Sequence, residues 1–75
     1  MSLYDVLDII GDINSEVKFK IVGELSNDAT KVNKIKNKLS RGYAPLEVIT
    51  EEFPLNILLS DMEYSDFEDR FQEES

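Results

Sequence analysis

The sequence contains no cysteine and no histidine. Without cysteine there is no disulfide, no thiolate nucleophile and no zinc–thiolate site, so the usual staples of small secreted domains are missing. Without histidine the chain lacks the commonest general base and the commonest transition-metal ligand. We therefore expect an intracellular protein with no catalytic residues and with a binding role rather than an enzymatic one.

Long apolar runs and clustered glycines are also lacking. The longest apolar run is Ile57-Leu58-Leu59, whereas a membrane span needs about 20 apolar residues. The chain shows no basic region followed by an apolar region and a cleavage site, as a secretory signal would. The glycines Gly11, Gly23 and Gly42 are isolated, which excludes a glycine-rich phosphate loop. We expect a cytoplasmic protein with no membrane contact and no cofactor.

Cations are scarce and unevenly placed along the chain. Eight basic residues stand against sixteen acidic ones, for a net charge of −8. Residues 1–30 carry six acids and two bases, residues 31–41 five bases and no acid, and residues 42–75 ten acids and one base. This charge argues against non-specific binding to nucleic acid and against docking on anionic lipid.

The length of 75 residues allows one domain with a thin margin of stability. We expect a single domain over residues 1–75, with an ordered core over 1–72 and a frayed tail over 73–75. Chains this short often gain stability from a second copy or from a partner, so a homodimer is one expected state.

Helix and strand signals alternate in the first half of the sequence. Ser2-Leu3-Tyr4-Asp5 has the pattern of a capping box, which predicts an amphipathic helix over 3–10 ended by Gly11. Residues 16–22 alternate polar and apolar side chains, which favours a strand with Val17, Phe19 and Ile21 facing inward. Turn residues over 23–28 then predict a reversal of the chain.

Residues 29–39 fit both a returning strand and a helix. We favour a strand over 29–34 that completes a hairpin, followed by a helical turn over 35–40 closed by Gly42. Two further runs, 47–53 and 55–60, are compatible with strands, although Pro45 at the first helical position would also permit a short helix over 46–52.

The C-terminal third predicts a helical turn or two. Ser65-Asp66-Phe67-Glu68 again has the pattern of a capping box, and Tyr64, Phe67 and Phe71 lie at helical spacing. The predicted fold class is therefore α+β: a short N-terminal helix packed on a small antiparallel sheet of three to four strands, with a C-terminal helical turn.

Three segments carry a resemblance to known proteins: residues 3–10, the run Val17 to Val22, and Leu46-Glu47-Val48-Ile49 with Ile57-Leu58-Leu59. In this order they resemble small acidic proteins encoded by bacteriophages and prophages. The resemblance implies a helix, a β-hairpin, a connecting turn and a further pair of strands, and a location in the cytoplasm of a bacterial host cell. This chain departs from that pattern in its basic segment, residues 31–41, and in its acidic extension after Met62.

The acidic C-terminal segment is the feature that we expect to be functional. Its carboxylates could in principle hold a hard cation, but residues 61–69 contain no glycine for the sharp turn of a calcium loop, so we expect no metal site. Negative charge beside aromatic anchors suits a basic protein surface better, although Phe67 and the other aromatics also fit a core. The predicted partner-binding residues are Asp61, Glu63, Tyr64, Asp66, Glu68, Asp69, Glu73 and Glu74.

The basic segment, residues 31–41, is interpreted as a counterweight to the acids, within the chain or across a dimer. It lacks the interleaved aromatics on which single-strand binders stack bases, so we expect no direct binding of nucleic acid.

Two functional hypotheses follow from these features. The first is a non-enzymatic interaction module, a phage-encoded modulator that masks a basic, nucleic-acid-binding or regulatory surface of a host protein, as a nucleic-acid mimic does. The alternative is a small homo-oligomeric assembly protein, in which the basic segment docks on the acidic C-terminal face of a neighbour.

Overall fold

The computed structural model describes the backbone of residues 1–74 and the side chains of residues 1–72, and within that range it is all helical. The helices are α1 (Leu3–Ile13), α2 (Ser15–Ser26), α3 (Ala29–Ser40), α4 (Pro45–Glu52), α5 (Leu55–Leu58) and α6 (Asp61–Glu74). The predicted α+β class with a small antiparallel sheet is therefore wrong. Each of the four expected strands lies in a segment that is helical or that links two helices.

Helix α1 begins as the sequence predicts. The amide of Asp5 donates to Ser2 Oγ at 3.2 Å, and the amide of Ser2 donates to Asp5 Oδ2 at 3.0 Å, which completes the capping box. The predicted end at Gly11 is wrong, because the helix continues for two more residues. Gly11 is instead covered by Lys18, whose Cδ would lie 2.5 Å from a Cβ at that position.

The predicted strand over 16–22 is the middle of α2. The side chains of Val17, Ile21 and Leu25 are buried at four-residue spacing, whereas Phe19 is 80% exposed. Because Phe19 points away from the core, the alternation that suggested a strand has no structural counterpart. Asn14 starts the helix by accepting hydrogen bonds at Oδ1 from the first amides of α2.

Helix α3 replaces the strand predicted over 29–34. Ile35 and Leu39 form its buried face, and Asp28 caps its first turn by accepting a backbone hydrogen bond of 3.0 Å. The reversal expected over 23–28 is confined to two residues, because α2 continues to Ser26. The helical turn predicted over 35–40 is confirmed, and Gly42 follows it with φ of 89°, in the region that favours glycine.

The strands predicted over 47–53 and 55–60 are also wrong. Pro45 occupies the first helical position of α4, so the helix that the sequence left as an alternative over 46–52 is the one that forms. Pro54 follows the end of α4 and precedes the single turn of α5. The proline cannot continue α4, because it has no backbone N–H to donate to the preceding turn.

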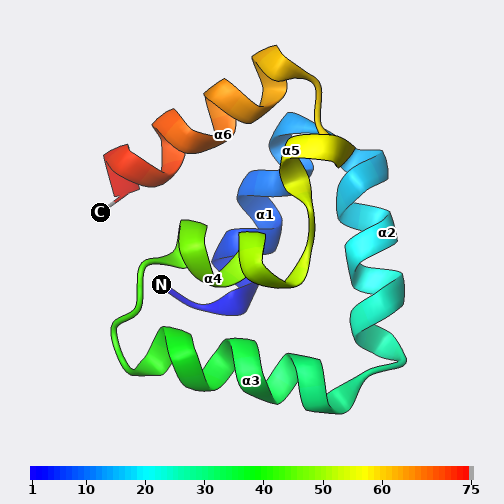
Figure 1. Cartoon of the computed structure of the whole chain (residues 1–75), viewed down its shortest axis with the longest axis vertical. Helices are drawn as coiled ribbons and strands as arrows, with labels where there is room; N and C mark the ends of the chain where they lie inside the picture. The colour runs from blue at the N-terminus through cyan, green and yellow to red at the C-terminus, as the bar shows by residue number, and fades with distance from the viewer. Residues whose placement is uncertain (75) are drawn as a thin grey trace.

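Helix α1 lies at the centre of the arrangement. It contacts α2, α3 and α6, and α4 bridges from α3 to α6. Figure 1 shows α2 and α6 on different sides of α1, with α3 across one end of the molecule. The outer faces of α2, α3 and α6 are therefore separate surfaces.

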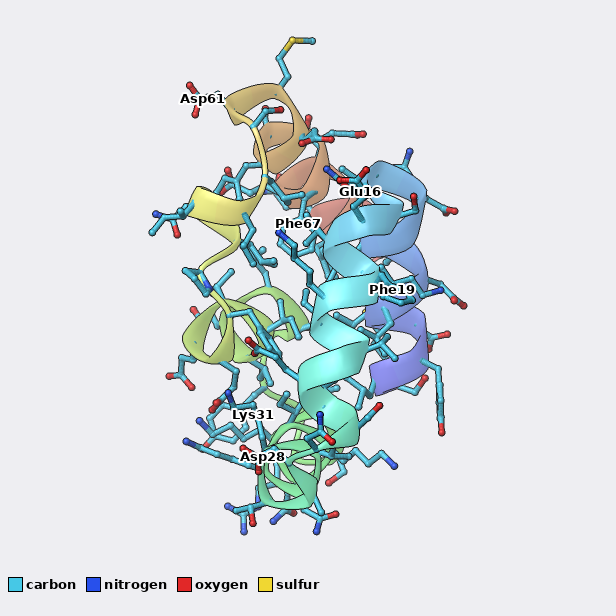
Figure 2. The ribbon with its side chains drawn as sticks, turned by 90° about the vertical axis from the view of Figure 1, so that its right-hand side faces the viewer. Glu16, Phe19, Asp28, Lys31, Asp61 and Phe67 are labelled. Carbon is cyan, nitrogen blue, oxygen red and sulfur yellow. The ribbon has the colours of Figure 1, made fainter. Side chains whose placement is uncertain are left out.

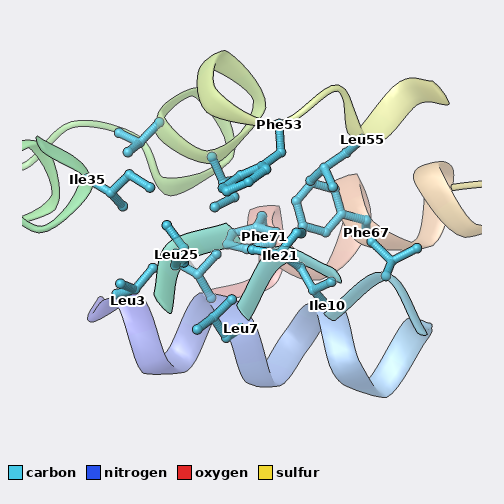
Figure 3. Packing of buried hydrophobic residues seen from close by; sticks show 14 of the residues in the cluster. Leu3, Leu7, Ile10, Ile21, Leu25, Ile35, Phe53, Leu55, Phe67 and Phe71 are labelled. Atoms are coloured by element: carbon cyan, nitrogen blue, oxygen red, sulfur yellow. The ribbon is translucent and has the colours of Figure 1, made fainter. Parts of the chain in front are cut away.

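One apolar core draws side chains from all of these helices (Figure 3). Among the described side chains no polar or charged residue is buried. No helix within residues 1–74 combines the length and the apolar character needed to cross a bilayer. The buried residues are Leu3, Val6, Leu7, Ile10, Val17, Ile21, Leu25, Ile35, Leu39, Val48, Ile49, Phe53, Leu55, Leu59, Phe67 and Phe71.

Candidate interaction surface on helix α6

Helix α6 starts at Asp61, five residues before the first helical residue implied by a capping box at Ser65. The amide of Glu63 donates to Ser60 Oγ at 3.2 Å, and the amide of Ser60 donates to Glu63 Oε1 at 3.0 Å. This capping box replaces the one predicted at Ser65 to Glu68, since Ser65 lies inside the helix. The pattern Ser60-Asp61-Met62-Glu63 was present in the sequence, but a strand assigned over 55–60 concealed it.

Glu63 also ties α6 to the corner between α1 and α2. Asn14 Nδ2 donates to both carboxylate oxygens of Glu63, at 3.1 and 3.3 Å. The backbone hydrogen bond from Ser60, with those from the Ser60 hydroxyl and Asn14, holds the pKa of Glu63 below its ordinary value. Glu63 therefore stabilises the fold, and its carboxylate already accepts hydrogen bonds within the chain.

The aromatic side chains of α6 belong to the core. Phe67 is 0% exposed and Phe71 is 4% exposed, and their ring centroids lie 4.5 Å apart in an edge-to-face arrangement. Tyr64 is half-buried and packs against the same cluster. Phe67 and Phe71 are thus not offered to a partner, and the interpretation of Phe67 as a core residue is confirmed.

The opposite face of α6 carries acids around one apolar side chain. Asp61, Met62, Asp66 and Asp69 are exposed and share one side of the helix, because their spacing follows its period. Met62 is 85% exposed and is not among the predicted partner-binding residues. A helix begun at Ser60 would have placed Met62 away from Phe67 and so revealed it. We call these four residues the acidic face.

Arg70 is the only base after Arg41 in the sequence, and it neutralises part of this region. Its Nε lies 3.4 Å from Asp66 Oδ1, and its Nη1 lies 3.6 Å from Asp12 Oδ2 of α1. Asp61 and Asp69 form no ion pair with any described side chain. No described cation therefore offsets the charge at the two ends of the acidic face.

The structure distributes the predicted partner-binding residues over different environments. Asp61, Asp66 and Asp69 are exposed, whereas Glu63, Tyr64 and Glu68 are half-buried. The side chains of Glu73 and Glu74 lie outside the described residues. Three of the predicted residues thus share the outer face of α6.

The basic segment is largely paired inside the chain. Lys34 Nζ lies 3.1 Å from Glu52 Oε1, and Lys38 Nζ lies 2.7 Å from Glu51 Oε2. The hydrogen bond between Lys38 and Glu51 raises the pKa of Lys38 and lowers the pKa of Glu51. These two pairs join α3 to α4.

Two further lysines of α3 lie over aromatic rings. Lys31 Nζ is 5.1 Å from the ring centroid of Phe53, and Lys36 Nζ is 5.9 Å from that of Tyr4. Both distances are within the range of cation–π attraction. Figure 2 shows Lys31 near one end of the molecule and Asp61 at the other. Lys31 and the acidic face thus lie far apart in the molecule.

A metal site and a general acid each place requirements on the described side chains. No three acidic side chains in this range come together as a cation site. A depression beside α1 is lined by Met1, Asp5, Asp8 and Ile9. The backbone hydrogen bond from Ser2 lowers the pKa of Asp5, which is the opposite of what a general acid requires.

No protein-family model, curated protein or solved structure matches this chain. The interpretation of the acidic face therefore rests on its own geometry and charge.

Proposed function

We propose that this protein is a non-enzymatic interaction module whose acidic face binds a basic surface of a protein partner. The surface that it covers is one that the partner uses to bind nucleic acid or to be regulated. The observation that carries this proposal is the pairing of the cations. The lysines of α3 are engaged by α4 and by aromatic rings, while Asp61 and Asp69 have no cation among the described side chains.

The composition of the acidic face suits such a partner. Exposed carboxylates steer a basic surface into contact and raise the association rate at low salt. Met62 supplies an apolar contact between them, and flexible thioether side chains adapt to partner surfaces of different shape. Protein interfaces commonly combine an apolar contact at the centre with polar and charged residues around it.

The alternative is docking of the basic segment on the acidic face of a neighbouring copy. Few cations of the basic segment are free to form such contacts. Lys34 and Lys38 would first have to leave Glu52 and Glu51. Arg41 is the one cation of the segment for which no ion pair or ring contact is found among the described side chains. The same shortage disfavours direct binding of nucleic acid through α3.

As part of the proposal, the protein acts in the cytoplasm of a bacterial host cell. The lack of cysteine suits a reducing compartment, and the resemblance to small acidic phage proteins suggests a host protein as the target.

The test is affinity capture of partners from a bacterial lysate at low salt, followed by affinity measurements on the captured protein. Two matched variants separate the acidic face from total charge. Asp61→Asn with Asp69→Asn removes two charges from α6, and Glu16→Gln with Glu47→Gln removes two exposed charges from α2 and α4 that likewise have no ion pair among the described side chains. We expect the first pair to weaken binding about tenfold or more and the second to leave it within about twofold.

A second comparison tests the apolar contact. Met62→Ser should weaken binding, whereas Tyr43→Ser, on the link between α3 and α4, should not. Capture of no partner at low salt, binding that is insensitive to salt, or equal binding by the two double variants would each refute the proposal.

A further inference from the structure

The outer face of α2 exposes an aromatic side chain that the fold does not use. Phe19 is 80% exposed, and Val22, three residues on, is 38% exposed. Figure 2 shows Phe19 on the outside of α2, away from the interior that holds Phe67. A depression lined by Ser15, Glu16, Phe19 and Lys20 lies beside the ring.

Gly23 lies on the same face as Phe19, one turn further along α2. A Cβ at Gly23 would meet no atom within 4 Å, whereas one at Gly11 would meet Lys18. Gly42 has a positive φ, but Gly23 lies in an ordinary helix. Glycine is a poor helix former, so its presence inside α2 needs a reason. Neither packing nor backbone conformation within the chain supplies one. A close approach by another molecule would explain it.

Helix α2 has balanced charge, so a second copy of this chain can approach it without strong repulsion. Helix α2 carries two acids and two bases (Glu16, Glu24, Lys18 and Lys20), whereas α6 carries seven acids and one base. Two molecules of net charge −8 repel each other through their acidic surfaces. Lys20 and Glu24 form no ion pair with any described side chain, so both are free to pair with a second copy.

We propose that two copies of the chain associate through α2, antiparallel and related by a two-fold axis. In this arrangement Phe19 of each copy packs over Gly23 of the other, where the missing side chain leaves room for the ring. With Phe19 opposite Gly23, Lys20 lies about 3 Å along the axis from Glu24 of the second copy. The lysine side chain spans that offset easily. The contact is self-complementary, as a two-fold interface requires.

The arrangement does not depend on the function proposed for α6. Helices α2 and α6 lie on different sides of α1 (Figure 1), so pairing through α2 leaves the acidic face of each copy open. A dimer would thereby present two acidic faces to one partner or to two. Such bivalence raises the effective affinity wherever both faces can engage at once.

Sedimentation equilibrium of the full chain, from micromolar to millimolar concentration, tests the proposal. We expect a reversible dimer for the wild type and a monomer for Phe19→Ser. Ile57→Ser is the matched control, because Ile57 is 76% exposed but lies on α5. This control should dimerise like the wild type, and all three proteins should keep the same helical circular-dichroism spectrum.

Charge reversal tests the register of the two helices. Lys20→Glu alone and Glu24→Lys alone should each weaken the dimer about tenfold, since two symmetric contacts change at once. The double variant should recover affinity, because each contact is then oppositely charged again. Gly23→Gln should abolish association by filling the space for the ring, while it leaves the monomer folded.

Three results would overturn the proposal. One is a wild-type chain that stays monomeric up to millimolar concentration at all salt concentrations. Another is a dimer that survives both Phe19→Ser and Gly23→Gln, which would place the contact elsewhere. The third is a double charge variant no tighter than the two single variants, which would exclude the antiparallel pairing of Lys20 with Glu24.

Discussion

Asn14 and Glu63 are joined by hydrogen bonds from Asn14 Nδ2 to both carboxylate oxygens, at 3.1 and 3.3 Å, across 49 residues of sequence. Each of the two residues also caps a helix. Asn14 accepts hydrogen bonds from the first amides of α2, and Glu63 accepts one from the amide of Ser60. The contact therefore couples the start of α6 to the corner between α1 and α2.

Substitution of Asn14 should separate its two roles. Asn14→Ala loses the cap of α2, which costs about 1 kcal/mol and lowers the melting temperature by about 4–8 °C in a domain of this size; loss of the contact with Glu63 adds to this. Asn14→Asp keeps a capping oxygen but sets a negative charge against Glu63, so its melting temperature should fall between those of Asn14→Ala and the wild type. Thermal unfolding followed by circular dichroism measures both.

Asn56→Ala serves as the control for these variants, because Asn56 is exposed on α5 and should shift the melting temperature little. An Asn14→Asp protein as stable as the wild type would show that the contact with Glu63 contributes nothing.

Acidification should remove the stabilisation that Glu63 provides. Its pKa in the folded protein is below the ordinary value of 4.5, so the stabilisation is complete above that value and is lost as the pH falls through the folded pKa. Glu63→Gln should therefore melt below the wild type at neutral pH, and the difference should shrink as the pH falls toward 3. Melting temperatures measured over this range test the sign.

Asp69→Asn is the control for the pH dependence of the melting temperature of Glu63→Gln. Asp69 is exposed and has no ion pair among the described side chains, so removing its charge from a strongly acidic chain should leave the melting temperature unchanged or raise it slightly. A deficit of Glu63→Gln that stays constant with pH would contradict the capping role of the Glu63 carboxylate.

Two glycines should respond to alanine with opposite signs. Gly42 has φ of 89°, so Gly42→Ala should cost about 1–2 kcal/mol. Gly23 lies inside α2 with nothing near a built Cβ, so Gly23→Ala should stabilise the monomer by about 0.5–1 kcal/mol. Urea unfolding in the Phe19→Ser background measures both effects without association. Equal signs for the two substitutions would contradict the backbone described here.

Two phenylalanines should differ sharply in their effect on stability. Phe67 is 0% exposed, so Phe67→Ala should cost about 3–5 kcal/mol, enough to unfold much of a small domain whose total stability is about 5–15 kcal/mol. Phe19→Ala should change the stability of the monomer by less than about 0.5 kcal/mol. Far-ultraviolet circular dichroism and urea titration report both. A large loss from Phe19→Ala would indicate a buried strand residue, as the sequence first suggested.

Local signals in the sequence predicted the helix ends better than the elements between them. The capping box at Ser2 and the glycine at position 42 behave as their chemistry predicts, because each acts on the backbone within one turn. The run after Pro45 was compatible with a strand or with a helix begun by the proline, and the helix is the one that forms. The alternation at Val17, Phe19 and Ile21 misled because three apolar residues at two-residue spacing suit a strand, while Val17, Ile21 and Leu25 suit a helix equally well.

The candidate site was predictable in part. Acidity after residue 42 was evident from the sequence, and with it the expectation that Asp61, Asp66 and Asp69 face water. The burial of Phe71 beside Phe67 agrees with their four-residue spacing, but the exposure of Met62 was not predictable, because Met62 lies before the helix start that the sequence suggested. The observed start depends on Ser60 and Glu63, whose capping pattern competed with a strand assignment.

The sequence by itself determined the charge of this protein, the absence of cysteine and histidine chemistry, and the positions at which chain-breaking and capping residues act. The tertiary structure decided which apolar residues lie inside and which acids stay unpaired. Both depend on contacts between segments far apart in the chain, such as Lys34 with Glu52 and Arg70 with Asp12. Burial against other helices outweighs the weak local preference of a β-branched run, and no short window of sequence contains that information.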